Sequence, residues 1–407
     1  MITRVKRLGL AFAVAASALL VAAPSASATF SNLPDQTWMT NGIVYSVVQS
    51  GNTVYVGGKF RALRRCPTGV SCPNGTIQTV NVGAFDATTG EGVRSFTVNV
   101  GGDGATVYAL AVLDGKLYIG GKFTSVNGEP RLNLAAIDAT TGALDPFAPQ
   151  IGVDGTDYVR GMIAHQGTLY IGGLFTTVNG LARPRLAAFT STGALDPNWR
   201  PKVSGAARAF VPSCDGSQLI VGGSFTRAGG TGTAYQERKT LAIFDASTGA
   251  LDTWTPDNAE IPNGVSAYDL AMIPTCGSIF IGYGGSNAIY RIDISDDFGD
   301  IIWGLHTGGN VQTVAVYGDR VLFGGHFANT PIAPDTTAKV KRVRFATADF
   351  DGNALNDWTP EFAGKFYGPW DILTNETTDQ VWVGGQFTLV SDVQQYFVAR
   401  FSDVPTG

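Results

Sequence analysis

Seven side chains that could contact a ligand occur near the start of seven similar runs of small apolar residues. They are Tyr45, Tyr108, Arg160, Arg208, Asp269, Gln312 and Trp370. The runs around them stay alike while these seven positions vary, and such variation is expected where a repeated scaffold builds a ligand site. Aromatic faces beside polar groups suit sugars. We therefore expect a binding site at the mouth of a channel; the alternative is an ordinary channel lining in contact with water.

Bond cleavage is a second interpretation of the same residues. Asp269 with Arg160 or Arg208 could serve a hydrolase or lyase that acts on a polymer. The sequence contains no zinc-protease helix motif, no Gly-x-Ser-x-Gly nucleophile elbow and no calcium-loop pattern. We therefore assign no catalytic residue, no metal ligand and no cofactor, and prefer a binding module to an enzyme. A third interpretation is a structural spacer without a ligand.

Four arginines form another repeated set, because they occupy matching positions before the expected third strand in four of the repeated units. They are Arg131, Arg183, Arg238 and Arg342. As a binding ring they could hold carboxylates or sulfated and uronic sugars through paired hydrogen bonds. As part of the scaffold, each would bind a loop carbonyl or a neighbouring aspartate. Their repetition favours the scaffold, since one ligand rarely needs an equivalent residue in every unit.

A recurring segment, apolar-x-apolar-Gly-Gly-x-Phe, positions all these residues. Its seven copies, of which the one at residues 279–285 is altered, have their first glycines at positions 57, 120, 172, 222, 282, 324 and 384. Repeats of this length built from short β-type runs indicate a repeat architecture. Glycine in mid-strand predicts a bulge or a close neighbouring backbone. A phosphate loop is excluded because no helix pattern and no Gly-Lys-Ser/Thr ending follow.

One unit is divided by its turn residues into four short strands. Residues 107–112, 116–124, 134–137 and 144–147 are the predicted strands, separated by turns such as Asp114-Gly115. Four antiparallel strands repeated seven times predict an all-β fold, a seven-bladed β-propeller.

The last unit lacks its fourth strand at the carboxyl end. The missing strand has a counterpart at the other end of the chain, where residues 34–38 resemble residues 251–254. We therefore expect the N-terminal segment to close the last blade, because a closed ring leaves no exposed strand edge.

The first residues have the pattern of a secretory signal peptide. Arg4, Lys6 and Arg7 precede an apolar run that ends at an Ala26-Ser27-Ala28 cleavage pattern. We expect a signal peptide over 1–28 and a single domain over 29–407, with no membrane span in the mature form. The product would be secreted, extracellular or associated with the cell wall, and monomeric. A net charge of -5 without basic clusters argues against nucleic acid as a partner.

The four cysteines suit an oxidising compartment. Cys66 and Cys72 bracket a short loop that a disulfide could close. Cys214 and Cys276 precede the glycine pair in consecutive units, where they could join two neighbouring blades. Metal binding is the alternative, but the three histidines are scattered and the spacing is too wide. We therefore expect disulfides and leave open whether Cys214 pairs with Cys276.

The assembled motif resembles the delta-60 repeat family of bacterial β-propellers. The resemblance rests on residues 169–175, on Val178-Asn179-Gly180, on Arg183, and on residues 186–188 and 193–197. It covers almost the whole mature chain and implies an exported, surface-associated bacterial protein. It supplies no family-wide catalytic residues. Together with the varied positions, it predicts a binding module for an envelope glycan or an extracellular protein.

Overall fold

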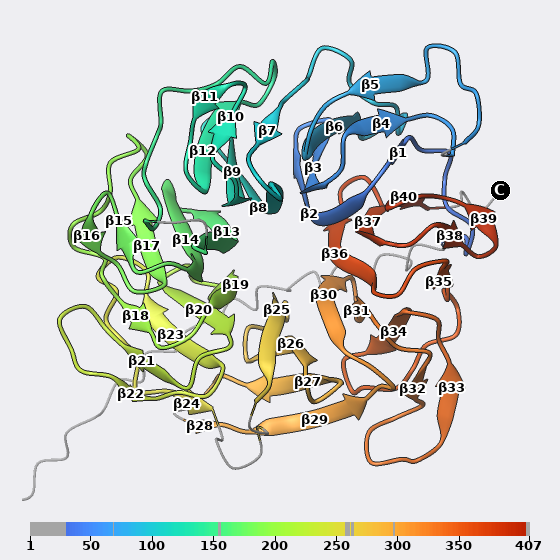
Figure 1. Cartoon of the computed structure of the whole chain (residues 1–407). Coiled ribbons are helices and arrows are strands. Elements are labelled where there is room, and N and C mark those ends of the chain that lie inside the picture. The colour runs from blue at the N-terminus through green and yellow to red at the C-terminus, as the bar shows by residue number, and fades with distance from the viewer. Residues whose placement is uncertain are drawn as a thin grey trace, which may run out of the picture.

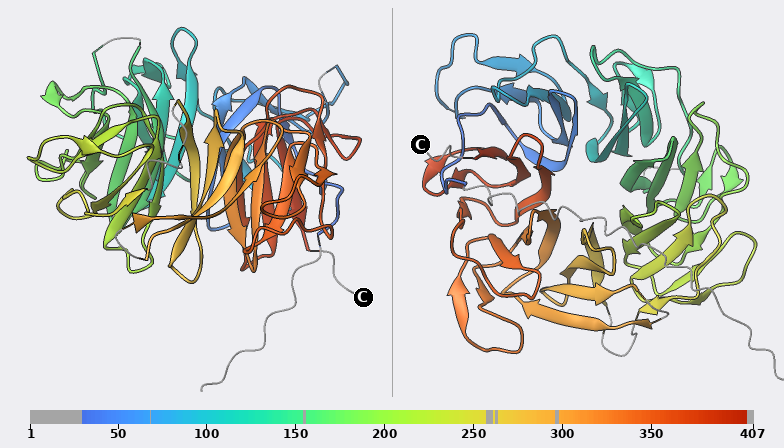
Figure 2. Two further views of the ribbon diagram at one scale, coloured as in Figure 1. Left: turned by 90° about the horizontal axis from the view of Figure 1, so that it is seen from below. Right: turned by 180° about the vertical axis from the view of Figure 1, so that it is seen from behind.

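The chain folds as seven similar β-sheets arranged round a common axis (Figure 1). The computed structural model describes residues 30–67, 69–153, 156–256, 261, 264–295 and 298–403, and all regular elements within these ranges are strands. The predicted signal peptide over 1–28 lies outside the described residues. Seen from the side, the strands of the sheets run between the two faces of the ring (Figure 2).

In each of these seven sheets the first strand is nearest the axis. The second strand pairs with the first and the third with the second, all antiparallel. The inner strands are β2 (Ile43–Ser50), β8 (Thr106–Leu113), β13 (Tyr158–His165), β19 (Ala207–Pro212), β25 (Ser266–Met272), β30 (Val311–Tyr317) and β36 (Gly368–Asn375). The second strands are β3 (Thr53–Lys59), β9 (Lys116–Lys122), β14 (Thr168–Leu174), β20 (Gln218–Gly223), β26 (Ser278–Gly284), β31 (Arg320–Gly325) and β37 (Gln380–Gln386). The third strands are β6 (Val82–Asp86), β12 (Leu134–Asp138), β17 (Leu186–Phe189), β23 (Leu241–Asp245), β27 (Ala288–Asp293), β34 (Phe345–Asp349) and β40 (Val398–Ser402).

Short strands in the loops form small additional sheets. The three-stranded ones are β1 (Met39–Thr40) with β4 (Ala62–Arg64) and β5 (Thr76–Gln78), β7 (Val100–Gly101) with β10 (Ser125–Val126) and β11 (Glu129–Pro130), β18 (Lys202–Val203) with β21 (Arg227–Gly229) and β22 (Gln236–Glu237), and β35 (Phe362–Ala363) with β38 (Leu389–Val390) and β39 (Val393–Gln394). The two-stranded ones are β15 (Thr177–Val178) with β16 (Leu181–Ala182), β24 (Thr255–Pro256) with β28 (Phe298–Gly299), and β32 (Asn329–Pro331) with β33 (Lys339–Lys341).

The first glycine of each pair lets neighbouring sheets approach closely. A Cβ on Gly120 would lie 2.7 Å from Val159 Cγ1 in the next sheet, and a Cβ on Gly384 would lie 2.5 Å from Val44 Cγ1. Gly384 belongs to the last sheet and Val44 to the first. Contacts between inner strands follow the same order, from β2 through to β36 and back to β2. The seven sheets therefore pack against one another all the way round.

The second glycine lets the inner strand of its own sheet bulge. A Cβ on Gly121 would lie 2.1 Å from the carbonyl oxygen of Thr106. Opposite this contact, Val107 pairs with Gly121 and Ala109 with Gly120, which leaves Tyr108 unpaired. The glycine pair thus has the structural role that the sequence predicts in six sheets, and the bulge recurs in every inner strand, including the fifth, where Tyr283 replaces the second glycine.

The predicted fourth strand is much shorter than expected. Among the described residues, only the fifth sheet has a full fourth strand, β29 (Ile301–His306). In five others it is reduced to a single bridge: Phe85 to Gly92, Ile137 to Leu144, Phe189 to Leu195, Phe244 to Leu251 and Ala348 to Ala354. Competing hydrogen bonds explain this in the second sheet, because the Asp145 carboxylate accepts the Phe147 N–H at 2.9 Å and Pro146 has no N–H to donate.

The N-terminal segment lies along the free edge of β40. Phe30 forms an antiparallel bridge with Asp403, and the Asp35 N–H donates to the Arg400 carbonyl at 2.8 Å. The Arg400 guanidinium and the Asp35 carboxylate form an ion pair of 2.9 Å. The two ends of the described chain are therefore in contact, but residues 34–38 form no strand, and the seventh sheet comprises β36, β37 and β40 alone.

Candidate functional site

The bulges of the inner strands bring seven residues to one place on the ring axis. These residues are Tyr45, Tyr108, Arg160, Arg208, Tyr268, Gln312 and Trp370. A bulged residue has no partner opposite it, so its side chain can be turned away from the regular direction of the strand. All seven line a single cavity of 230 Å³.

Six of these residues are the ones expected from the sequence, and the fifth sheet differs by one position. There the bulge falls on Tyr268, while Asp269 is the next residue and pairs with Gly282. Asp269 lines the same cavity, one residue further along the strand than the bulge. The register of the fifth sheet matches that of the fourth: the turns at residues 213–217 and 273–277 have the same length, and Tyr268 precedes Gly282 by as many residues as Arg208 precedes Gly222.

Aromatic rings form a continuous row across the mouth of the cavity. The ring centroids of Tyr45 lie 5.3 Å from Tyr108 and 5.4 Å from Trp370. Tyr268 lies 6.4 Å from Trp370 on the other side. Tyr367, which is 42 % exposed in the loop before β36, extends the row at 5.6 Å from Trp370. The row therefore leads from the exposed loop face down to the cavity.

Two arginines lie on these rings. The guanidinium of Arg160 is 5.2 Å from the centroid of Tyr108 and 5.8 Å from that of Trp370. The guanidinium of Arg208 is 5.3 Å from Tyr268. Stacking on aromatic faces stabilises a guanidinium without using its N–H groups. Both arginines are partly buried, and burial together with the charge of Arg208 lowers the pKa of Arg160.

Several buried polar atoms around this cavity have no hydrogen-bond partner among the described residues. They are Arg208 Nε, Gln312 Oε1 and Trp370 Nε1. Two of them are donors and one is an acceptor. Buried polar groups in proteins are rarely left unpaired, so three on one small cavity indicate a place where a polar ligand can bind.

An acidic pair lies one residue beyond the bulges. Asp371 and Asp269 both line the cavity. The Val47 N–H donates to Asp371 Oδ2 at 2.7 Å, and the Val314 N–H donates to Asp269 Oδ2 at 3.0 Å. In both cases the donor belongs to the next sheet. Ser46 has the same role, since its hydroxyl accepts the Leu110 N–H at 3.2 Å. The carboxylates therefore join neighbouring sheets.

Burial makes both carboxylates less acidic. Burial raises the pKa of Asp371 to about 7, and the nearby charge of Asp269 adds to this effect. Burial also raises the pKa of Asp269 to about 6, although hydrogen bonds from Val314 and Thr313 oppose it. The cavity therefore becomes more positive as the pH falls through neutrality. The sequence did not identify Asp371; its only signal is that it occupies the same repeat position as Asp269.

A larger hollow of 660 Å³ lies between the first and second sheets, away from the axis. Its polar side chains already serve the fold. Asn81 accepts the Phe60 N–H and donates to the carbonyls of Val100 and Ala105. Asn41 accepts the Arg61 N–H at 2.8 Å. The smaller axial cavity is the better candidate because its polar atoms are unpaired.

The repeated arginines belong to the scaffold. Arg183 donates to the carbonyls of Ala182 and Asp196, each at 3.0 Å. Arg131, Arg238 and Arg342 make the same pair of bonds to the corresponding carbonyls. Their N–H groups thus fasten a loop to the turn after the third strand, as the repetition predicts.

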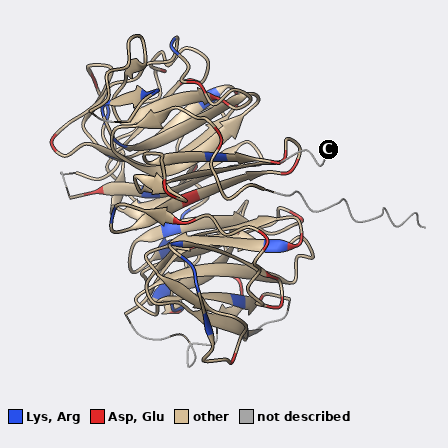
Figure 3. Ribbon diagram, turned by 90° about the vertical axis from the view of Figure 1, so that its right-hand side faces the viewer, with Lys and Arg blue, Asp and Glu red and all other residues tan. Residues whose placement is uncertain are grey.

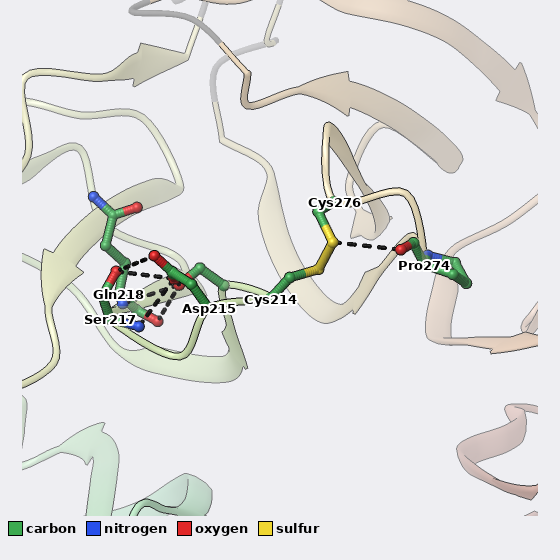
Figure 4. The surroundings of a disulfide bond; sticks show 7 residues. Cys214, Asp215, Ser217, Gln218, Pro274 and Cys276 are labelled. Atoms are coloured by element: carbon green, nitrogen blue, oxygen red, sulfur yellow. Dashed lines mark hydrogen bonds between the residues drawn. A yellow bond between two sulfur atoms is a disulfide. The ribbon is translucent and has the colours of Figure 1, made fainter. Parts of the chain in front are cut away.

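All four cysteines form disulfides. Cys66 pairs with Cys72 within one loop. Cys214, between β19 and β20, pairs with Cys276, between β25 and β26, and so joins the fourth and fifth sheets (Figure 4). This pairing resolves the alternative that the sequence left open.

Two further findings concern the described residues alone. No group of three or more His, Cys, Asp or Glu side chains within them could hold a metal ion. None of them forms a helix with the length and apolarity that crossing a membrane requires.

Basic and acidic residues are interspersed over the ribbon (Figure 3).

Comparison with known proteins places the fold. Residues 113–147 and 167–198 match the family model "Domain of unknown function (DUF5122) beta-propeller". The chain is also similar to the structure of U3-55K, at 9% identity and a TM-score of 0.55, covering 89% of this chain and 96% of that one. It is similar to the RRP9 WD40 repeats, at 10% identity and a TM-score of 0.57, covering 93% and 99%.

A third similar structure is the Cps50 (Swd1) beta-propeller domain of Myceliophteria thermophila, at 12% identity and a TM-score of 0.53, covering 90% of this chain and 98% of that one. No curated protein matches the chain in sequence. At these identities the likeness shows the fold alone. The described chain is thus an all-β, propeller-like protein, and this fold is typical of interaction modules.

Proposed function

We propose that the chain is an exported, seven-bladed β-propeller that binds a glycan of a cell envelope at the mouth of its ring. Residues 1–28 are its signal peptide, and residues 29–407 form one domain that acts as a monomer outside the cell or in the cell wall. The segment over residues 30–38 completes the seventh blade. Two disulfides are compatible with this compartment, and the resemblance to delta-60 repeats supports export.

The observation that carries the proposal is the combination of aromatic row and unpaired polar atoms at the axial cavity. Sugar rings have apolar faces that stack on aromatic side chains and hydroxyl groups that pair with polar ones. Tyr45, Tyr108 and Trp370 supply the faces. Gln312 Oε1 and Trp370 Nε1 supply an acceptor and a donor. Small apolar residues elsewhere on the inner strands offer no such pairing.

The test is binding of the purified protein to an array of envelope glycans and to proteins from culture supernatant. We expect the double variant Y108A/W370A to lose glycan binding, because it removes two of the stacking faces. The matched control is Y235A: Tyr235 is also an exposed aromatic residue in contact with cations, but it lies outside the cavity.

The array also separates the possible partners. Glycan binding that survives Y108A/W370A contradicts the site. Capture of an extracellular protein by the wild type, lost in Y108A/W370A and without any glycan signal, would replace the glycan by a protein partner at the same mouth.

A second candidate is a hydrolase or lyase that acts on a polymer. The observation that favours it is the pair Asp269 and Asp371, whose pKa values of about 6 and about 7 suit acid-base catalysis. Against it, each carboxylate accepts a backbone hydrogen bond from the next sheet. Release of new reducing ends from a bound oligosaccharide, abolished in both D269N and D371N, would establish the enzyme; binding without release supports the module.

A further inference from the structure

Arg160 and Arg208 are unusual among the arginines that line or surround the ring. Arg131, Arg183, Arg238 and Arg342 each bind two backbone carbonyls. Among the described residues, by contrast, no group accepts a hydrogen bond or forms an ion pair of 4.0 Å or less with the guanidinium of Arg160 or Arg208. Buried, unpaired Nε atoms occur in all four scaffold arginines as well as in Arg208, so the distinction lies in the terminal N–H groups, which bind carbonyls only in the scaffold arginines. Two guanidinium groups on one cavity thus have their N–H donors available.

The aromatic rings hold these two arginines in place. Arg160 is stacked on Tyr108 and close to Trp370, while Arg208 is stacked on Tyr268. A stacked guanidinium keeps its edge free, and that planar edge matches the two oxygens of a carboxylate. The rings therefore orient the arginines without occupying the groups that would bind an anion.

Among the described residues, the carboxylates of the cavity form no ion pair of 4.0 Å or less with this pair, although burial raises the pKa of both and the charge of Arg160 opposes this rise. Asp371 and Asp269 lie one residue further along their strands than the bulges. Their oxygens are engaged by the N–H groups of Val47 and Val314 in the next sheets. The level nearer the exposed Tyr367 therefore carries the positive charges, and the level beyond it carries the carboxyl groups.

We propose that the mouth of the ring recognises an acidic sugar, a hexuronate unit whose carboxylate binds Arg160 and Arg208 while its ring stacks on the aromatic row. This inference rests on the proposed glycan binding and names its substrate class. Trp370 Nε1 supplies a further donor to the ligand. Gln312 Oε1 accepts from a sugar hydroxyl. The cavity of 230 Å³ accommodates one sugar unit, so an extended chain would be held at a single residue or at its end.

The test compares a carboxylate with its uncharged ester on the same sugar. The probes are tetramers of galacturonic acid and of glucuronic acid, each with its methyl ester, titrated calorimetrically into the wild type at one ionic strength. We expect at least one acid to bind about 10-fold or more tightly than its ester, since charge-assisted hydrogen bonds are the stronger kind. The variant R160Q/R208Q should lose this preference.

Two further variants exclude trivial explanations. R160K/R208K keeps the charge but loses the planar fork, so it should keep only part of the preference. R227Q removes one positive charge and one arginine-tyrosine contact outside the cavity, so it should bind as the wild type does. Thermal unfolding of every variant shows that the ring is intact.

The outcomes separate this inference from the proposed function. Equal binding of acid and ester, lost in Y108A/W370A, overturns the acidic sugar and leaves a glycan site. A preference that R160Q/R208Q retains overturns the role of the two arginines. Binding of neither acid overturns the inference, while the glycan array still decides whether the mouth binds a neutral sugar.

Discussion

The buried carboxyl of Asp371 predicts a specific dependence of stability on pH. Burial raises its pKa to about 7 in the folded protein, from an ordinary value of 3.8. The folded state therefore favours the protonated form, and the stability this contributes is present at low pH and lost as the pH rises through about 7. The perturbation is D371N, which keeps an oxygen for the Val47 N–H and removes the titration.

The magnitude follows from the two pKa values. Between pH 5 and pH 7 the carboxyl is ionised in the unfolded chain and still mostly protonated in the folded one. Each pH unit in this range lowers the free energy of unfolding by about 1.4 kcal/mol. Because the cavity admits some water, we expect a loss of about 2 kcal/mol in the wild type from this residue between pH 5 and pH 8, and none in D371N.

The assay is equilibrium urea unfolding, followed by tryptophan fluorescence, at pH 5, 6, 7 and 8. The difference in the free energy of unfolding between D371N and the wild type should grow in favour of D371N as the pH rises. The control is D215N: hydrogen bonds lower the pKa of the exposed Asp215 to about 2, so it is ionised in both states throughout this range. Parallel curves for D371N and the wild type would refute the account of the acidic pair.

Three further predictions concern the packing, the disulfides and the ligand. G121A should lower the free energy of unfolding in the urea assay by about 1 to 3 kcal/mol, because the new Cβ would collide with the Thr106 carbonyl oxygen. G308A should be nearly neutral, because no atom lies closer than 3.6 Å to the position of its new Cβ. C214S/C276S should cost about 2 to 4 kcal/mol, more than C66S/C72S, because its loop is longer (sequence separation 62 against 6); the reverse order would contradict the chain-entropy account. A hexuronate tetramer should bind about 5-fold more tightly at pH 6 than at pH 8, because Asp371 and Asp269 near Arg160 and Arg208 become protonated as the pH falls. Its methyl ester should bind equally at both pH values, and calorimetric titration of both ligands measures the difference.

Much of this architecture could be predicted because the glycine pair occupies the same position in six of the seven repeats. The glycine pair marks where one sheet touches the next and where each inner strand bulges. The varied positions at the start of the inner runs, among them Tyr108, Arg160 and Trp370, line the axial cavity. The pattern is informative because a Cβ at either glycine would collide with backbone or side chain.

Two expectations differ from the structure. In the fifth unit the bulge falls on Tyr268, one residue before Asp269, and the offset between Arg208 and Gly222 in the fourth unit already indicates this position. The fourth strand of the second sheet is short because the Asp145 carboxylate takes the Phe147 N–H and Pro146 has none to donate. This effect depends on local geometry that a strand pattern does not encode.

The sequence singled out Asp269 but not its proximity to Asp371. Asp269 and Asp371 are far apart in the chain and meet only because the ring brings the fifth and seventh sheets to one axis. Their hydrogen bonds to Val314 and Val47 also cross between sheets. Such contacts follow from ring closure rather than from any local motif.

The most direct test of the central claim uses the indole N–H of Trp370. The protein has seven tryptophans, and Trp370 Nε1 has no partner among the described residues but lines the axial cavity. In nitrogen-15 correlation spectra, its signal, assigned with W370F, should shift as the glycan captured on the array is added. Trp254 Nε1 is also unpaired but lies outside the cavity, so its signal should stay fixed. A Trp370 signal that does not move at saturating glycan would contradict a binding site at the mouth of the ring.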